Sequence, residues 1–489
     1  MPLVWLMGVF LLFYAVQKPV PAGQALAVVR TGLDLAAALF IFVLGAALGR
    51  RLLARFPFQT EGERWLFGVG VGLAALSIAT LVLGLAGGFS HLTLSAMAAL
   101  LSLLMLPALY SALRAAATIL RSLRPPLPLR LYFAISLALS LLLALAPPST
   151  AFDALLYHLA GPKLYLEAGR IYAIDNPPLY FPSLVEMLFG LAMAIRGDIA
   201  AQLLHYGYGT LSAGAAYLIA SRFLSPQSRW WALALLWSMP MFPLLMGWAY
   251  VDLALLFYEL LAAYAFLRWL EDESRPWLLL SGACAGLAMG VKYTAFVLPL
   301  ALLGLWAWHA LRRGRFQARL VEGILFCVLA LGVAAPWFLR NGWLVGNPIY
   351  PFLWGGKFWD SWLAHWYEQP GTGVGLDLAS LLRLPLSITL GVDLWGGARD
   401  ETFYDGRTGP LLLALLPVLL IARRIPGRAN PDGACRAAEL GSADPGQRVR
   451  LPQPPALPLR LRGARRISAP RPGPSLCGHG IHQHPASGG

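Results

Sequence analysis

The chain has 489 residues, of which 58% are hydrophobic and 13% are charged, and its mean hydropathy is +0.63. A soluble protein has about 25% charged residues, so the composition excludes an ordinary soluble enzyme, a disordered chain and a disulfide scaffold. The formal net charge is +14, but the segment from Arg423 to the end holds 11 Arg and 3 acids and supplies +8 of it. The charge therefore does not indicate nucleic-acid binding.

Long apolar segments recur along the chain, and about 20 apolar residues suffice to cross a bilayer. We expect an all-α, polytopic transmembrane helix bundle of about 11–13 spans. The candidate spans are 3–16, 31–49, 65–86, 90–113, 131–147, 184–196, 199–220, 230–247, 251–269, 277–291, 293–310, 321–339 and 409–422. The segment 184–196 is too short to cross unaided, which favours a re-entrant or interfacial element, or one broken element together with 199–220.

Loop charge sets the expected orientation, because arginine-rich loops stay in the cytoplasm. The arginine-rich loops are 50–64, 114–130, 222–229, 268–275 and 312–319. This pattern leaves 148–183 and 340–408 as extracytoplasmic loops that carry short helices. The prediction is a multi-pass protein of the inner (plasma) membrane whose site lies on the outer face.

Three regions follow from this division. Residues 1–130 hold N-terminal transmembrane helices, and 131–423 form a core with both outer loops. The last 66 residues, 424–489, are rich in Pro, Arg, Gly and Ala. Such a segment buries too little surface to offset its chain entropy. It is interpreted as a disordered cytoplasmic tail or a frame-shifted end, and its histidines (His479, His482 and His484) as an adventitious metal binder.

The first outer loop contains an acidic residue close to the membrane surface. If residues 153–158 are helical, Tyr157 follows Asp153 at i+4 and shares its face, and His158 is turned partly away. A partly desolvated carboxylate is suited to act as a general base. Helix N-capping is the alternative role for Asp153. Tyr157, His158 and Lys163 are candidate substrate-binding residues.

A second acidic point lies where the span 230–247 ends on the same side. Asp252 stands at this point, and Glu259 lies two turns deeper on the same helical face. Ionisable residues at such depth usually have a role. Lys292 also reaches the outer face, and it is one of only four lysines. It suits a phosphate contact, and snorkelling to the interface is the alternative. For Asp252 the alternative role is a helix N-cap. For Glu259 the alternative is an interhelical hydrogen bond or pairing with Lys292.

The last outer loop begins with Ala335-Pro336-Trp337-Phe338-Leu339-Arg340-Asn341 and continues into Gly346-Asn347-Pro348-Ile349-Tyr350-Pro351. Arg340 can fork onto a phosphate, and Asn341 can hydrogen-bond beside it. The many Trp and Tyr residues that follow are typical of an interfacial aromatic belt. A set of stacking faces for sugar rings or isoprenoid is the other interpretation.

The order of these features resembles the GT-C superfamily of membrane glycosyltransferases, especially the glycosyltransferase family 39 and aminoarabinose transferase-like members. The features are the acid of the first loop, the second acid, Gly286-x₃-Gly290-x-Lys292 and the loop at 335–351. The resemblance covers about residues 130–425 and differs in that Ala154 stands where some members have a second acid.

The resemblance implies transfer of a sugar from a polyprenyl-phosphate donor to a lipid, glycan or protein acceptor, with inversion. It implies that Asp153 is the catalytic base, that Asp252 is the second acid, and that Lys292 and Arg340 contact the donor phosphate. The resemblance makes no cofactor certain, and a divalent metal is left open. The alternatives are a multi-pass transporter or flippase, in which Asp252, Glu259 and Lys292 form a relay, and a structural membrane protein without catalysis.

Overall fold

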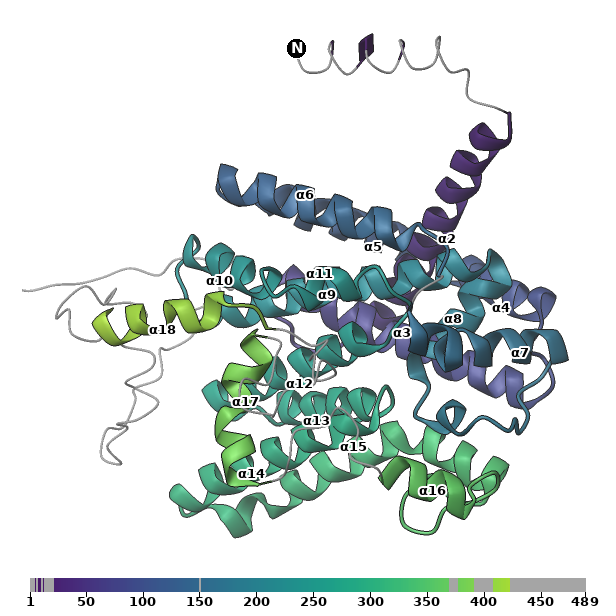
Figure 1. The fold of residues 1–489 in the computed structure, drawn as a ribbon. Helices are drawn as coiled ribbons and strands as arrows, with labels where there is room; N and C mark the ends of the chain where they lie inside the picture. Colours follow the sequence, from purple (N-terminus) through teal and green to yellow (C-terminus); the bar gives the residue numbers. More distant parts are fainter. Residues whose placement is uncertain are drawn as a thin grey trace, which may run out of the picture. The chain divides into compact units, whose positions relative to one another are not determined.

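The computed structural model describes residues 22–148, 151–368, 377–390 and 408–422, with four isolated positions before them. Every regular element in these ranges is a helix (Figure 1). The predicted all-α fold class is therefore confirmed. Most of the segment 3–16, parts of the loop 340–408 and the whole tail 424–489 with its histidines lie outside the described residues.

The helices follow the predicted segments, with short helices inserted in both expected outer loops. In chain order they are α2 (Ala22–Leu52), α3 (Glu61–Leu85), α4 (His91–Leu104), α5 (Leu106–Ser122), α6 (Leu127–Ala144), η1 (Ala154–His158), α7 (Ala160–Ala168), η2 (Pro177–Tyr180), α8 (Leu184–Ile195), α9 (Asp198–Phe223), α10 (Ser228–Trp237), α11 (Met241–Leu245), α12 (Asp252–Asp272), α13 (Arg275–Met289), η3 (Tyr293–Phe296), α14 (Val297–Arg312), α15 (Phe316–Val345), α16 (Ser361–Glu368), α17 (Leu378–Leu390) and α18 (Leu411–Ala422).

Six helices of the described residues are long and apolar enough to cross a membrane, and a bent pair brings the number to at most seven. They are α2, α3, α6, α12, α15 and the helix formed by η3 with α14. This number is below the expected 11–13 because several apolar segments form shorter helices. For example, α8 has 12 residues, as expected for a segment that does not cross unaided.

Two segments expected as single spans are interrupted. The segment 90–113 is divided into α4 and α5, which are bent by 83°, and Pro107 lies in the first turn of α5. The segment 230–247 is divided into α10 and α11 near Pro240. Proline lacks a backbone N–H and cannot continue the hydrogen-bond ladder of a helix.

In contrast, α15 runs past Arg340, so the last outer loop begins at Gly346 and not at 340.

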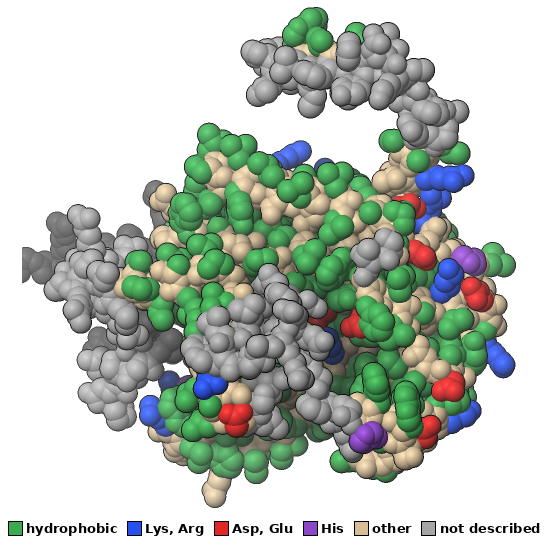
Figure 2. All heavy atoms as spheres, in the orientation of Figure 1, with side chains coloured by type: hydrophobic (Ala, Val, Ile, Leu, Met, Phe, Trp, Pro, Cys, Tyr) green, Lys and Arg blue, Asp and Glu red, His purple; other side chains and the backbone are tan. Residues whose placement is uncertain are grey.

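Apolar side chains cover most of the face seen in Figure 2, and charged groups on it are few. The helix α6 shows the pattern most clearly, because its exposed residues include Leu127, Leu131, Ile135, Leu139 and Leu142. A soluble protein rarely exposes such a continuous apolar surface. We infer that these faces contact lipid, as the composition predicts.

Glycine pairs bring the helices of the bundle into backbone contact. Gly45 and Gly49 of α2 face Gly68 and Gly72 of α3, and a Cβ added at Gly49 or Gly72 would collide with a carbonyl group of the other helix. Small residues four positions apart allow this close approach between membrane helices. The contact therefore depends on the absence of side chains.

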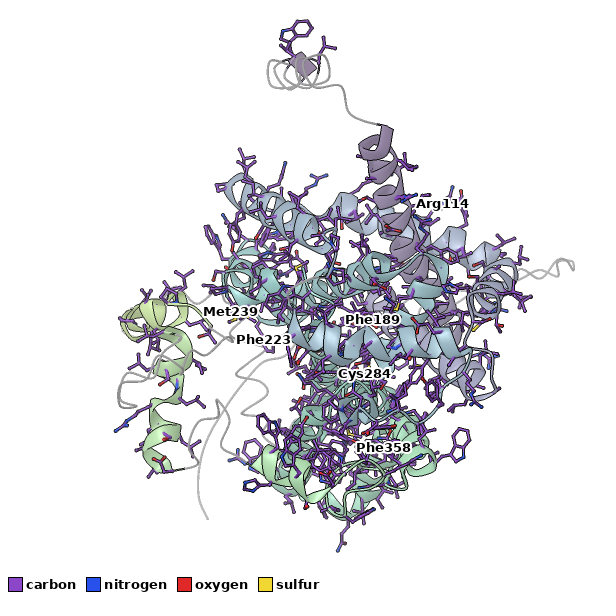
Figure 3. The ribbon with its side chains drawn as sticks, turned by 45° about the vertical axis from the view of Figure 1, so that its right-hand side comes forward. Arg114, Phe189, Phe223, Met239, Cys284 and Phe358 are labelled. Carbon is purple, nitrogen blue, oxygen red and sulfur yellow. The ribbon has the colours of Figure 1, made fainter. Side chains whose placement is uncertain are left out.

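The helix α13 packs against α15 in the same way. A Cβ at Gly282 would lie 2.8 Å from the carbonyl oxygen of Phe326, and a Cβ at Gly286 would collide with the backbone of α15. A Cβ at Gly290 would lie 2.5 Å from the indole Nε1 of Trp337 on the same helix. Cys284, between the first two of these glycines, is fully buried in the bundle, as is Phe189 of α8 (Figure 3). This packing fixes the end of α13, which leads directly to Lys292.

The substitution Gly72→Ala should destabilise the protein by about 1–3 kcal/mol, the usual cost of overpacking, because the new methyl group collides with α2. Gly32→Ala is the control, since nothing lies within 4 Å of a Cβ at that position of α2. The measurement is the thermal unfolding midpoint in detergent. Equal midpoints for the two variants would contradict the proposed contact.

Candidate active site

Asp153 and Tyr157 form a hydrogen-bonded pair at the start of the first outer segment. They are joined by the π-helix η1, in which the Leu159 N–H donates to the Ala154 carbonyl at 2.9 Å. The Tyr157 hydroxyl donates to Asp153 Oδ2 at 3.2 Å. The predicted shared face is therefore confirmed. Asp153 makes no side-chain capping bond to η1, so the alternative role as an N-cap is not seen.

Several nearby negative charges affect the pKa of Tyr157. Burial raises the pKa of its phenol, and the charges of Asp153, Glu186 and Asp252 raise the pKa further. The phenol consequently stays protonated at physiological pH and acts as a hydrogen-bond donor, not as a base.

Asp252 and Lys292 form the second pair. Lys292 Nζ lies 3.0 Å from Asp252 Oδ1, and the two side chains are 36% and 35% exposed. Asp252 is the first residue of α12, and Lys292 follows the glycine-packed end of α13. Lys292 thus pairs with Asp252 and not with Glu259, one of the partners considered from the sequence.

The two pairs are connected through aromatic rings. The ring of His158 lies 4.1 Å from that of Tyr157 and 5.7 Å from that of Tyr250, measured between centroids. Tyr250 stands two residues before Asp252. The first outer segment therefore packs against the start of α12, and the structure brings Asp153, Tyr157, His158, Asp252 and Lys292 together.

Glu186 is a member of this site that the sequence analysis did not single out. Its Oε1 lies 2.8 Å from His158 Nδ1, and the side chains of His158 and Glu186 are 3% and 9% exposed. The sequence does contain a signal for this role, because Glu186 is an acid inside the apolar segment 184–196. Burial of an acid in such a segment is costly unless it has a partner.

Arg340 and Asn341 are placed differently from the expectation. Arg340 is buried, and its guanidinium donates to Ser183 Oγ at 2.7 Å and to the Phe181 carbonyl at 2.9 Å. Asn341 donates to the Tyr180 carbonyl. In this arrangement the two residues hold the segment 177–183 in place, and the predicted direct contact of Arg340 with a phosphate is not available without displacing these groups.

Two further expectations concern Lys163 and a metal. Lys163 is exposed on α7, and no hydrogen bond or ion pair joins it to the two pairs in the described part of the chain. Within the same residues, no three His, Cys, Asp or Glu side chains gather closely enough to hold a metal ion. The donor set at the site therefore does not fit the divalent metal left open from the sequence.

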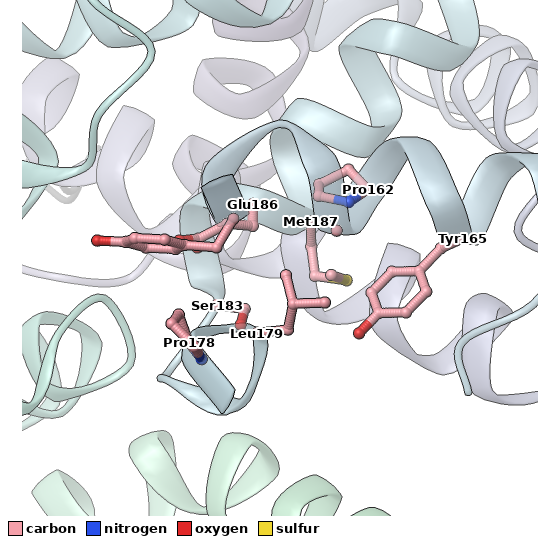
Figure 4. A pocket seen from close by; sticks show the side chains of 9 residues that line it. Pro162, Tyr165, Pro178, Leu179, Ser183, Glu186 and Met187 are labelled. Atoms are coloured by element: carbon pink, nitrogen blue, oxygen red, sulfur yellow. The ribbon is translucent and has the colours of Figure 1, made fainter. Parts of the chain in front are cut away.

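A narrow cavity lies beside the Asp153–Tyr157 pair. Its lining includes Tyr157, Tyr165, Ser183, Glu186 and Met187 (Figure 4). Its volume is about 10 Å³, which is room for about one water molecule. A group that enters it reaches both the Tyr157 ring and the Glu186 carboxylate.

A larger open hollow lies where the two outer segments meet. Its volume is about 430 Å³, and its lining includes Asp175 from the first segment and Phe358, Trp359, Asp360 and Trp362 from the second. This volume is in the range of small-molecule sites, about 300–1,000 Å³. A cluster of Tyr180, Val345 and Tyr350 packs against Phe358 and Trp359, so the hollow rests on the segment that Arg340 and Asn341 hold.

Comparisons with known proteins agree with this picture. Residues 175–339 match the family described as dolichyl-phosphate-mannose-protein mannosyltransferase. The resemblance to the GT-C glycosyltransferases is confirmed. Protein O-mannosyl-transferase 1 of Mus musculus is 28% identical over 161 residues, which are 31% of this chain and 19% of that protein. The chain thus spans about a fifth of the length of the curated relative it matches, and no solved structure matches it.

The buried hydrogen bonds of Arg340 predict that the substitution Arg340→Gln mainly destabilises the protein. Hydrogen bonds from a charged donor contribute about 1.5–3 kcal/mol each, and their loss leaves buried carbonyl groups without partners. Lys292→Gln, at a partly exposed pair, should change stability by less than about 1 kcal/mol. Thermal unfolding of both variants measures the difference, and an unchanged midpoint for Arg340→Gln would argue against its positioning role.

Proposed function

We propose that this chain is an integral membrane glycosyltransferase that transfers a sugar from a polyprenyl-phosphate donor to a lipid, glycan or protein acceptor. In this proposal the core is 131–423 and the reaction takes place on the outer face of the inner membrane, with inversion of the anomeric carbon. The observation that carries the proposal is the packing of Tyr157 and His158 against Tyr250, since Tyr157 is bonded to Asp153 and Tyr250 stands beside the Asp252–Lys292 pair. This packing supports a site that holds both a carboxylate base and a cation.

In the proposed reaction the carboxylate of Asp153 and the ammonium group of Lys292 each have one role. Asp153 takes the proton of the acceptor hydroxyl, and the acceptor oxygen forms a bond to the anomeric carbon from the side opposite the phosphate. The bond between that carbon and the phosphate oxygen breaks, and the polyprenyl phosphate leaves with both electrons. A base in hydrogen-bond reach of the proton and a cation beside the leaving group act on the transition state.

The two hydrogen-bonded pairs hold Asp153 and Lys292 in position for the proposed reaction. Tyr157 holds Asp153 Oδ2 by a hydrogen bond, and this leaves Oδ1 for the acceptor proton. Asp252 holds Lys292 at the surface of the site. Lysine has three N–H donors, so the ammonium group retains donors for a phosphate. In this proposal Lys292, and not Arg340, contacts the donor phosphate.

The hollow lined by Asp175, Trp359 and Trp362 is proposed to bind the acceptor. Carboxylates accept hydrogen bonds from hydroxyl groups, and indole faces pack against the apolar side of a sugar ring or a peptide. Tyr157 contacts Phe181, with ring centroids 6.1 Å apart, and Phe181 adjoins Tyr180 beneath the hollow. Adjacent side chains therefore link the hollow to Tyr157, the hydrogen-bond partner of the proposed base.

The test of the function is transfer of radiolabelled mannose from polyprenyl-phosphate mannose into acceptors in membranes that contain the full chain. Mannose is the first sugar to try, because the matched family is described by it. The substitution Asp153→Asn should lower transfer by about 10²–10⁴-fold, the contribution of a general base.

Glu167→Gln, which changes an exposed acid of α7, is the control and should leave transfer unchanged. Equal transfer by the wild type and Asp153→Asn would remove Asp153 as the base. Movement of the donor across the bilayer without any covalent transfer would favour the flippase alternative.

The acceptor hollow predicts a separate effect on the Michaelis constant. Trp362→Ala should raise KM for the acceptor by about 5–10-fold, since loss of an aromatic contact weakens binding by about 1 kcal/mol, with little change in KM for the donor. Trp354→Ala changes an equally exposed tryptophan outside the hollow and serves as the control. The same KM for acceptor in both variants would indicate an interfacial aromatic belt instead.

A further inference from the structure

The buried carboxylate of Glu186 has one oxygen that nothing in the described structure satisfies. Oε1 is engaged by His158 Nδ1 at 2.8 Å, but Oε2 is buried and has no hydrogen-bond partner among the described residues. A buried polar group without a partner costs about 1–3 kcal/mol, and native structures contain few of them. This oxygen can therefore accept a hydrogen bond from a group that is not part of the chain.

The surroundings of Oε2 restrict what that group is. Glu186 lines the cavity beside Tyr157, and the cavity admits about one water molecule or one hydroxyl group. The Ser183 hydroxyl on its wall donates to the Phe181 carbonyl at 2.7 Å, so it does not satisfy Glu186. The guanidinium of Arg340 is within electrostatic reach of Glu186, which disfavours a second cation. A neutral hydrogen-bond donor fits the site best.

The Tyr157 side chain contacts the proposed base and also lines the cavity. Tyr157 donates to Asp153 on one side and lines the cavity with Glu186 on the other. Because Tyr157 contacts Asp153 and also lines the cavity, the proposed function orients the ring positions next to the anomeric carbon toward the cavity. A carboxylate built to accept a hydroxyl discriminates strongly against ligands that lack it, because the unpaired acceptor remains buried.

We propose that Glu186 Oε2 accepts a hydrogen bond from one hydroxyl group of the donor sugar, and that His158 holds the carboxylate in the required orientation. The inference rests on the proposed function, since it assigns a role in recognition of the sugar donor. It makes Glu186 a residue that determines specificity, with His158 as its positioning residue.

The experiment compares polyprenyl-phosphate mannose with its 2-, 3-, 4- and 6-deoxy analogues on the purified full chain. Wild type and Glu186→Gln are each tested for donor binding at equilibrium and for transfer. In Glu186→Gln the amide oxygen can still accept from His158, but an NH₂ donor replaces the acceptor oxygen in the cavity. One deoxy analogue should bind the wild type about 10–100-fold more weakly than the parent.

Glu186→Gln should bind the parent donor about 10–100-fold more weakly than the wild type does. The same deoxy analogue should bind this variant no more weakly than the parent donor does. Glu167→Gln is the matched control and should reproduce the wild-type pattern. His158→Gln should give a smaller loss with the same dependence on the analogue, and it keeps the test readable if Glu186→Gln does not fold.

The outcomes separate the two proposals. A wild type that binds the donor and responds to one deoxy position, but transfers nothing, overturns the proposed function and supports the role of Glu186. Transfer with the same analogue pattern in wild type and Glu186→Gln overturns the role of Glu186. A uniform loss for all analogues in Glu186→Gln indicates a bound water and also overturns it, and absence of both binding and transfer overturns both proposals.

Discussion

The buried contact between Arg340 and the segment 177–183 is the constraint on which the site depends. Arg340 is enclosed near the end of α15, and it joins that helix to the Phe181 carbonyl and the Ser183 hydroxyl. Desolvation of a guanidinium is costly unless its donors are used, so the segment has little freedom once this contact forms. The segment leads directly into α8, which carries Glu186, and its other side supports the open hollow.

Glycine packing provides the matching constraint on the second half of the site. The close approach of α13 to α15 through Gly282, Gly286 and Gly290 sets where Lys292 leaves the bundle. The Gly290 carbonyl also accepts a hydrogen bond from the Leu184 N–H at 2.9 Å. One backbone contact thus connects the end of α13 to the start of α8, and the lysine and Glu186 are held by the same framework.

In the proposed function, this framework gives one acidic site with a different role for each carboxylate. Asp153 is held by a tyrosine, Asp252 by a lysine and Glu186 by a histidine. Each of these pairs uses one carboxylate oxygen, and the proposed function assigns the remaining donors and acceptors to the substrate. Three acids in one region would repel one another if each were unpaired, and their different partners are what allow them to act as base, anchor and specificity residue in the function proposed above.

The sequence by itself determined the all-α membrane fold class, because the apolar content depends only on composition. It also determined the Asp153–Tyr157 pair, which follows from i+4 spacing, and it pointed to Asp252 and Lys292 as ionisable residues in an apolar chain. Only the tertiary structure decided that His158 turns to Glu186, 28 residues away, that Lys292 pairs with Asp252, and that Arg340 is enclosed. Those outcomes depend on which helices touch, and contacts between distant segments arise from packing that no local pattern of residues encodes.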